Sequence, residues 1–128
     1  MRLLLDTHAL LWALDENPRL SRAARAAIGD PANTLLISAV SGFEIATKHR
    51  LGKLPEFAPI ARDFPGILDQ FEHEVLPVGM DHAALAGSMD IEHKDPFDRL
   101  LIAQARIERV PIVSNEEAFD KLGVERVW

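Results

Sequence analysis

Short apolar runs alternate with helix-like segments along the whole chain, and this alternation limits the possible folds more than any other feature. The runs have the length and composition of buried strands, and they occur at 3–5, 34–37, 74–78, 111–114 and 124–127. Helices are predicted between them, at 9–14, 21–28, 39–51, 81–89 and 96–109. Strands that alternate with helices usually form a mostly parallel sheet. The sequence therefore predicts an α/β sandwich.

Length and composition indicate one globular domain spanning residues 1–128, because a chain of 128 residues is too short for two. Hydrophobic residues make up 48% of the chain and charged residues 27%, the usual balance for a folded protein. The chain has no cysteine, which excludes disulfides and cysteine-based zinc sites. The longest N-terminal apolar run has neither the length of a signal peptide nor that of a membrane span. We expect a cytoplasmic protein with no membrane partner.

The charge balance is acidic, with 14 Lys and Arg against 20 Asp and Glu and a net charge of −6. This argues against binding nucleic acid through positive charge alone, because neutralising phosphates requires clustered Lys and Arg. If the chain acts on nucleic acid, a bound metal ion is the natural source of positive charge at the site.

Acidic residues follow several of the predicted strands. Asp6 comes directly after the first strand, and Glu44 lies near the start of the helix after the second. Asp95 and Asp98 open the helix that precedes the fourth strand, and Glu116 follows that strand. In an open parallel sheet, functional sites lie beyond the carboxyl ends of the strands. The sequence therefore predicts that these acids converge on one edge of the sheet.

Such a cluster requires a cation. Two like charges about 4 Å apart repel by roughly 4 kcal/mol at an effective dielectric of 20. Hard divalent cations with all-oxygen ligands, Mg²⁺ or Mn²⁺, fit the chemistry of clustered carboxylates. Such ions activate water and stabilise a scissile phosphate. The cluster thus favours metal-dependent phosphodiester hydrolysis.

Each acid also has a purely structural interpretation. Asp95 fits the N-cap of a helix, and Asp98 fits the first turn, where the helix dipole favours an acid. Asp6 can cap the helix that follows it, and Glu44 can form a capping box with the serine three residues before it. Glu116 can be a solvated surface residue. These interpretations explain the acids one by one but not their common placement.

Other chemistry has weaker support. The five histidines lack zinc-type spacing, so surface or packing positions are expected for them. No glycine-rich phosphate loop and no nucleophile elbow are present. A basic stretch near Lys48 fits either contact with RNA or a solvated helix end, where the dipole favours cations.

Four segments of the chain resemble PIN-domain proteins and, more narrowly, VapC-type toxins of bacterial toxin–antitoxin pairs. They lie at 3–8, 37–44, 93–105 and 112–119, and the stretch from His93 to Ala105, which contains Asp-Pro-Phe-Asp, is the most specific. The resemblance implies a PIN-like three-layer α/β/α sandwich with a central, mostly parallel sheet. It also implies an Mg²⁺- or Mn²⁺-dependent endoribonuclease with an RNA substrate, a homodimer, and inhibition by a cognate antitoxin.

The family's acids correspond to residues of this chain. Asp6 matches the first, Glu44 the second and Asp98 the third, while Asp95 either assists metal binding or caps its helix. The fourth family acid is usually Asp, but Glu116 stands here, which leaves the occupancy of a second metal site open. On this hypothesis Asp6 and Asp98 hold the principal metal, and Glu44 ligates it or positions the attacking water.

Supporting residues are expected around these acids. The hydroxyls of Thr7 and Ser114 would orient carboxylates or phosphate, and Asn115 would assist Glu116 in a weaker second site. Ser38 lies in the matching segment that leads to Glu44.

Two further questions remain open at this level. The proline-rich segment 54–71 predicts one or two short helices with exposed apolar residues, and Phe57, Phe64 and Leu68 either form an antitoxin groove or pack in the core. The rival functions are a nuclease-inactive PIN-fold binding module and an Mg²⁺-binding receiver-like signalling domain. The receiver-like function is disfavoured because the second strand ends at Ser38 rather than at an Asp.

Overall fold

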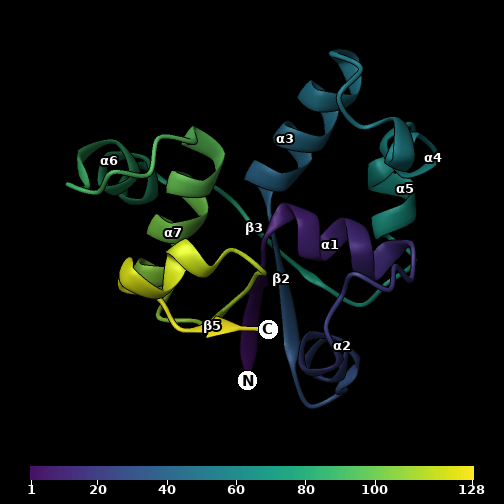
Figure 1. Ribbon diagram of the computed structural model, residues 1–128, viewed down its shortest axis with the longest axis horizontal. Helices are drawn as coiled ribbons and strands as arrows, with labels where there is room; N and C mark the ends of the chain where they lie inside the picture. Colours follow the sequence, from purple (N-terminus) through teal and green to yellow (C-terminus); the bar gives the residue numbers. More distant parts are fainter.

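A five-stranded sheet with the order β3-β2-β1-β4-β5 forms the centre of the molecule. A computed structural model describes residues 1–128 (Figure 1). Every neighbouring pair of strands is parallel, which confirms the predicted sheet. The strands are β1 (Arg2–Leu5), β2 (Thr34–Ser38), β3 (Glu74–Leu76), β4 (Ile112–Val113) and β5 (Arg126–Val127).

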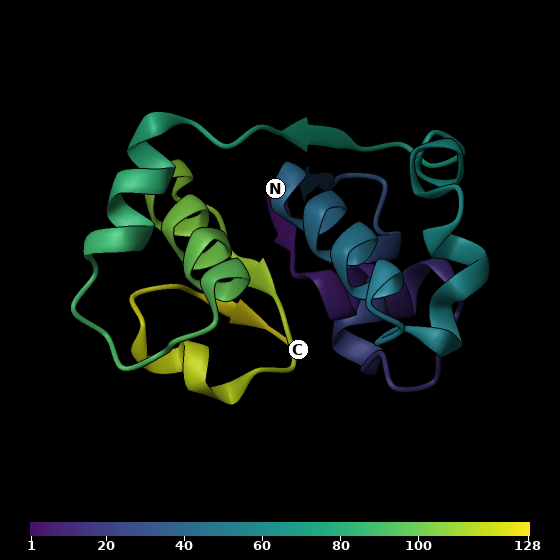
Figure 2. The same cartoon turned by 90° about the horizontal axis from the view of Figure 1, so that it is seen from above.

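Helices cover both faces of this sheet. Figures 1 and 2 show α6 and α7 on one side, and α1, α2, α4 and α5 on the other. The α-helices are α1 (Thr7–Leu14), α2 (Arg22–Gly29), α3 (Ala39–Arg50), α4 (Ala58–Ala61), α5 (Phe64–Leu68), α6 (Met80–Ser88) and α7 (Pro96–Glu108). Two 3₁₀ helices are η1 (Pro55–Phe57) and η2 (Glu117–Lys121). None of the helices has the length and apolar character needed to cross a lipid bilayer.

The central strand β1 explains why both faces must be covered. Leu3 and Leu5 point into the core on the side of α1 and α2, whereas Leu4 joins the core on the side of α6 and α7. All three are at most 1% exposed, and burying one such leucine contributes about 1.5–3 kcal/mol. A strand that is apolar on both faces suits a parallel sheet between two helical layers. The predicted α/β/α sandwich is confirmed.

The segment after α3 corrects one prediction. Its short helices were expected to expose apolar residues, but Phe57 is 4% exposed and Leu68 is 8% exposed. Both pack in the same core as Leu10 of α1, and Phe64 packs against that core. Of the two alternatives for these side chains, an antitoxin groove or core packing, the structure supports core packing. The prolines break the segment into short helices without turning their apolar sides to solvent.

A buried amide connects α7 to the end of β2. The hydroxyl of Ser38 donates to Oε1 of Gln104 at 2.6 Å, and Nε2 of Gln104 donates to the carbonyl of Pro77 at 3.1 Å. Gln104 is completely buried, so these polar groups cannot turn to water. The two bonds hold α7, β2 and the segment after β3 together just below the edge that carries the acids.

Replacing this amide tests its contribution to stability. Gln104→Ala is expected to lower the free energy of unfolding by about 2–3 kcal/mol, because it removes one buried and one partly buried hydrogen bond and leaves the Ser38 hydroxyl without its acceptor. Urea unfolding followed by circular dichroism measures the change. Gln70→Ala, at an exposed position after α5, serves as the control and should shift stability by less than about 0.5 kcal/mol. An equally small effect for Gln104→Ala would contradict this account.

A candidate metal centre at the carboxyl edge of the sheet

Asp6 lies where β1 passes into α1, and it is only 6% exposed. Its Oδ1 accepts a hydrogen bond from the Ala9 amide at 2.8 Å and caps α1, so the capping interpretation is correct. The pKa of Asp6 is raised to about 6, chiefly by burial and also by the charges of Glu44 and Glu116, while the Ser114 hydroxyl opposes the shift. Asp6 is therefore both a helix cap and a carboxylate whose negative charge is poorly compensated.

Glu44 lies in the second turn of α3. This helix begins at Ala39, and its N-cap is Ser38, whose hydroxyl accepts from the Val40 amide at 3.0 Å. The capping box with Ser41 therefore does not form, and the Ser41 hydroxyl instead hydrogen-bonds that of Thr7 at 3.0 Å. This bond joins the starts of α3 and α1.

The Glu44 side chain is almost fully buried, with 5% exposed. Its Oε2 accepts from Nζ of Lys48 at 2.5 Å, one helical turn further along α3. The other oxygen, Oε1, is buried and has no hydrogen-bond partner. A buried oxygen without a donor is uncommon in folded proteins, and it marks a place where a donor or a cation can bind.

Asp95 and Asp98 come from the start of α7. Asp95 is the N-cap, and its Oδ1 accepts from the amides of Phe97 at 2.9 Å and Asp98 at 3.2 Å. Asp98 Oδ2 accepts from Nε2 of His93 at 2.8 Å. The pKa of Asp98 is raised to about 6, mainly by burial and also by the charge of Asp95, whereas His93 lowers it.

The fourth predicted acid lies at the outer margin of the site. Glu116 follows β4, is exposed, and donates its backbone N–H to the Ser114 hydroxyl at 3.0 Å. Its side chain forms no ion pair, and the neighbouring Asn115 is exposed without a side-chain hydrogen bond. The Ser114 side chain therefore contacts two of the acidic residues: it hydrogen-bonds the Asp6 carboxylate and accepts the backbone N–H of Glu116.

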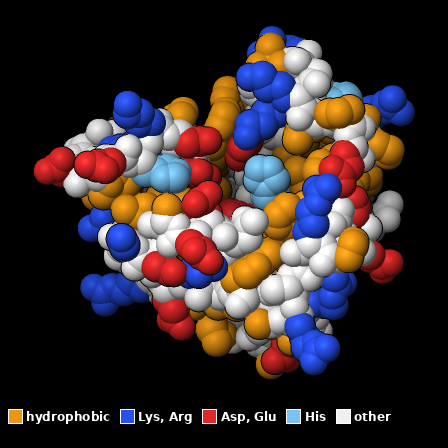
Figure 3. Space-filling model, in the orientation of Figure 1, with side chains coloured by type: hydrophobic (Ala, Val, Ile, Leu, Met, Phe, Trp, Pro, Cys, Tyr) orange, Lys and Arg blue, Asp and Glu red, His pale blue; other side chains and the backbone are white.

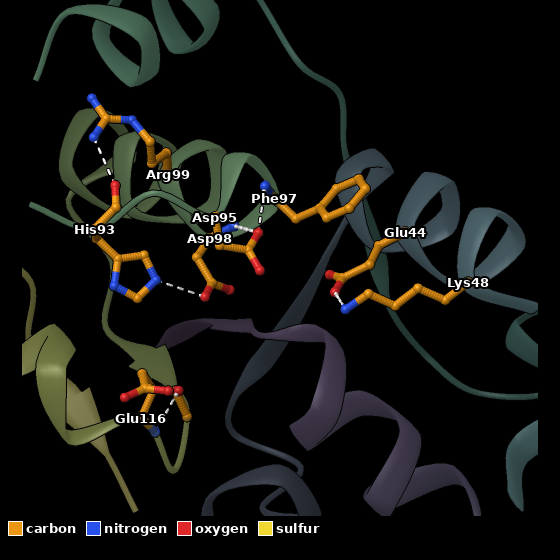
Figure 4. Close-up of polar contacts among 9 residues, drawn as sticks. Glu44, Lys48, His93, Asp95, Phe97, Asp98, Arg99 and Glu116 are labelled. Atoms are coloured by element: carbon orange, nitrogen blue, oxygen red, sulfur yellow. Dashed lines mark hydrogen bonds and ion pairs between the residues drawn. The ribbon is translucent and has the colours of Figure 1, made fainter. Parts of the chain in front are cut away.

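The acids lie at one edge of the sheet, as predicted. Figure 4 shows Glu44 on one side of the site, Asp95 and Asp98 opposite it, and Glu116 below them. In the space-filling view of Figure 3, acidic side chains and histidines surround a hollow that lies between α7 on one side and α1 and α3 on the other. However, no three acidic or histidine side chains lie close enough together to hold one metal ion. The structure brings the acids together without forming a finished coordination site.

The donor chemistry nevertheless fits a divalent cation. Asp6, Glu44 and Asp98 offer only oxygen ligands, which Mg²⁺ and Mn²⁺ prefer. Two of them have raised pKa values because burial leaves their charge uncompensated, and the third has an unpartnered buried oxygen. Lys48 and His93 hold oxygens of two of these acids.

Two of these contacts were missed by the sequence predictions. His93 was assigned a surface or packing position, but it contacts Asp98 directly. Its place five residues before Asp98, in the segment that carries the family resemblance, was the available signal. Lys48 was treated as a solvated helix end or an RNA contact, and the structure pairs it with Glu44. The i, i+4 spacing of this pair was visible in the sequence.

The raised pKa of Asp6 predicts how stability depends on pH. The folded state binds the Asp6 proton more tightly than the unfolded state, whose pKa is near 3.9, so this group's contribution makes the protein less stable as pH rises from about 4 through 6. Asp6→Asn keeps the helix cap and is expected to stabilise the metal-free protein at pH 7 by up to about 3 kcal/mol. At pH 3.5 the difference should nearly vanish.

Urea unfolding in EDTA at the two pH values measures this effect. Asp90→Asn, at an exposed acid without a hydrogen-bond partner, is the matched control and should show no such pH dependence. Destabilisation by Asp6→Asn at pH 7 would mean that the Asp6 charge is already compensated.

Comparisons with known proteins agree with this architecture. The family model of the PIN domain matches residues 3–125. The chain is 39% identical over 74 residues to Ribonuclease VapC16 of Mycobacterium tuberculosis, a match that covers 55% of this chain and 51% of that protein. It is 32% identical over 105 residues to Ribonuclease VapC22 of the same organism, covering 80% of this chain and 77% of that protein.

Solved structures share the fold. VapBC2 from Rickettsia felis, bound to a promoter DNA fragment, matches with a TM-score of 0.67 at 17% identity over 100% of both chains. VapBC-5 from M. tuberculosis matches with a TM-score of 0.65 at 18% identity, covering 98% of this chain and 97% of that one. The PIN-domain family model, which spans residues 3–125, argues against the receiver-like alternative. The chain therefore belongs to the PIN-domain family, and its relatives place it among the VapC proteins of that family.

Proposed function

We propose that this protein is a divalent-metal-dependent endoribonuclease and the toxin of a toxin–antitoxin pair. One observation carries the proposal: Asp6, Glu44 and Asp98 are drawn from three elements to one edge of the sheet, where burial leaves their charge incompletely compensated. The relatives named ribonucleases support the choice of RNA as substrate.

Asp6, Glu44 and Asp98 would hold the metal ion, with Glu116 and Asp95 at its margin. When bound, the ion would lower the pKa of a water molecule and offset negative charge on the scissile phosphate. It would also supply the positive charge that a chain of net charge −6 otherwise lacks for a polyanion.

The chain's own residues have distinct parts in this reaction. Asp6 and Asp98, with pKa values of about 6, are mostly ionised at pH 7 and can act as ligands. Oε1 of Glu44, which has no hydrogen-bond partner, would either ligate the ion or position the attacking water. Lys48 is the one lysine or arginine that pairs with an acid of the site, so its ammonium group can move from Glu44 to an incoming phosphate.

Two observations favour a second function, a nuclease-inactive PIN-fold module that binds RNA or protein. No three acids are gathered at coordination distance, and Lys48 already neutralises part of the charge of Glu44. The two functions differ in what metal addition does. A nuclease gains RNA cleavage, whereas a binding module gains none.

The cleavage assay uses the purified protein and a mixture of single-stranded and hairpin RNAs. We expect cleavage with Mg²⁺ or Mn²⁺ and none in EDTA. Asp6→Asn and Asp98→Asn should each lower kcat/KM by at least about 100-fold, because each removes a ligand. Asp90→Asn changes an exposed acid of the same type and should retain full activity. Wild-type activity in Asp6→Asn, or cleavage that survives EDTA, would contradict the metal-dependent mechanism.

We further propose a homodimer and a cognate antitoxin as partners. Solved structures of the same fold are described as VapBC or toxin–antitoxin complexes. Light scattering of the purified protein is expected to give twice the chain mass of 14.2 kDa. A small protein encoded next to this one should bind it when co-expressed and inhibit its cleavage of RNA. A single-chain mass at tens of micromolar would contradict the dimer.

A further inference from the structure

Arg99 makes an unusual set of contacts one residue after Asp98. Its guanidinium donates to four backbone carbonyls: Ala86 at 2.8 Å, Met89 at 2.6 Å, Ile91 at 3.3 Å and His93 at 2.9 Å. It forms no ion pair with an acid. A planar guanidinium carries five N–H donors in a fixed arrangement, and here they bind main-chain carbonyls.

These four carbonyls belong to the end of α6 and to the loop that leads to α7. The loop from Met89 to Lys94 lies outside helix and strand. The carbonyls of Ile91 and His93 accept hydrogen bonds only from Arg99, whereas that of Met89 also accepts the Ile91 amide at 3.0 Å. Because Arg99 is part of α7, its side chain fixes the loop relative to the helix that carries Asp98. Figure 4 shows the Arg99 contact to the His93 carbonyl.

His93 is the part of this loop that contacts the acids. Its ring packs edge-on against the buried Phe119, with ring centroids 5.6 Å apart and planes at 73°. Its Nε2 lies 2.8 Å from Oδ2 of Asp98, and an ionised carboxylate can only accept, so Nε2 is the donor. The carboxylate's other oxygen, Oδ1, accepts no hydrogen bond and lies on the side of Glu44 (Figure 4).

We propose that Arg99 and His93 are positioning residues for Asp98: Arg99 fixes the loop, and His93 holds Oδ2 so that Oδ1 faces the metal site. The proposal rests on the proposed function, in which Asp98 is a ligand. Carboxylates that bind metals are commonly oriented by a hydrogen bond to their other oxygen, and removing such a partner typically weakens metal binding about 10–100-fold. The competing account is that Arg99 and His93 contribute only to stability.

Calorimetric titration of the full chain with Mn²⁺ separates these accounts. His93→Ala is expected to raise the dissociation constant for Mn²⁺ about 10–100-fold. It should also lower Tm, because the side chain loses its packing against Phe119, so the affinity is the measurement that decides. His93→Gln, whose amide N–H can take the place of Nε2, should restore most of the affinity. Arg99→Lys keeps the charge but cannot reach four carbonyls, so it should also weaken binding.

Matched controls replace the same residue types away from the acids. His73→Ala changes a histidine whose ring hydrogen-bonds the Phe71 carbonyl and no side chain, and Arg22→Lys changes an exposed arginine of α2. Both should bind Mn²⁺ like the wild type. If Arg99→Lys fails to fold, the two His93 variants decide the question.

The proposal is overturned if His93→Ala binds Mn²⁺ as tightly as the wild type, if His93→Gln restores nothing, or if the wild type binds no Mn²⁺. A fall in Tm without a change in affinity would assign these residues to stability alone. A wild type that binds Mn²⁺ but cleaves no RNA would refute the proposed nuclease while leaving the positioning of Asp98 supported by the affinities.

Discussion

A carboxylate that is buried away from water loses hydration free energy unless a cation or a hydrogen-bond donor replaces the water. This cost applies to the acids at the carboxyl edge of the sheet. Helices cover both faces of the sheet, and their packing buries the acids at its carboxyl edge. Asp6, at the end of β1, and Asp98, in the first turn of α7, have pKa values of about 6 because burial disfavours their charged forms. The hydrogen bond from His93 opposes this shift at Asp98, and Lys48 neutralises part of the charge of Glu44. A bound divalent cation would compensate for the remaining negative charge of these acids.

The structural and functional interpretations of the acids turn out to be compatible. Oδ1 of Asp6 caps α1, and Oδ1 of Asp95 caps α7. A carboxylate has two oxygens, so a cap on one leaves the other for the site. The caps also fix where each side chain lies, because each one ties an acid to the first turn of a helix. Helix capping is therefore part of how the chain positions its candidate ligands.

The sequence predicted the elements well where the physical signal was local. Leu3 to Leu5 indicated a buried strand, and a strand ending at Ser38 indicated a helix beginning nearby with Glu44 near its start. The structure places Glu44 in the second turn of that helix. The segment 54–71 was less predictable, because prolines interrupt its periodicity and burial depends on what the short helices pack against. That the acids lie together could be predicted from the parallel order of the strands alone. The contacts of His93 and Arg99 could not be predicted in this way, because they depend on the path of an irregular loop.

The central claim is that Asp6, Glu44 and Asp98 bind one divalent ion. Diffraction from crystals soaked in Mn²⁺, with data collected at the manganese absorption edge, tests it most directly. The account predicts an anomalous peak within about 2.5 Å of oxygens from at least two of these three residues. Two results would contradict it. One is fully occupied Mn²⁺ at another place on the protein, and the other is the absence of a peak near these acids, with Lys48 still paired with Glu44.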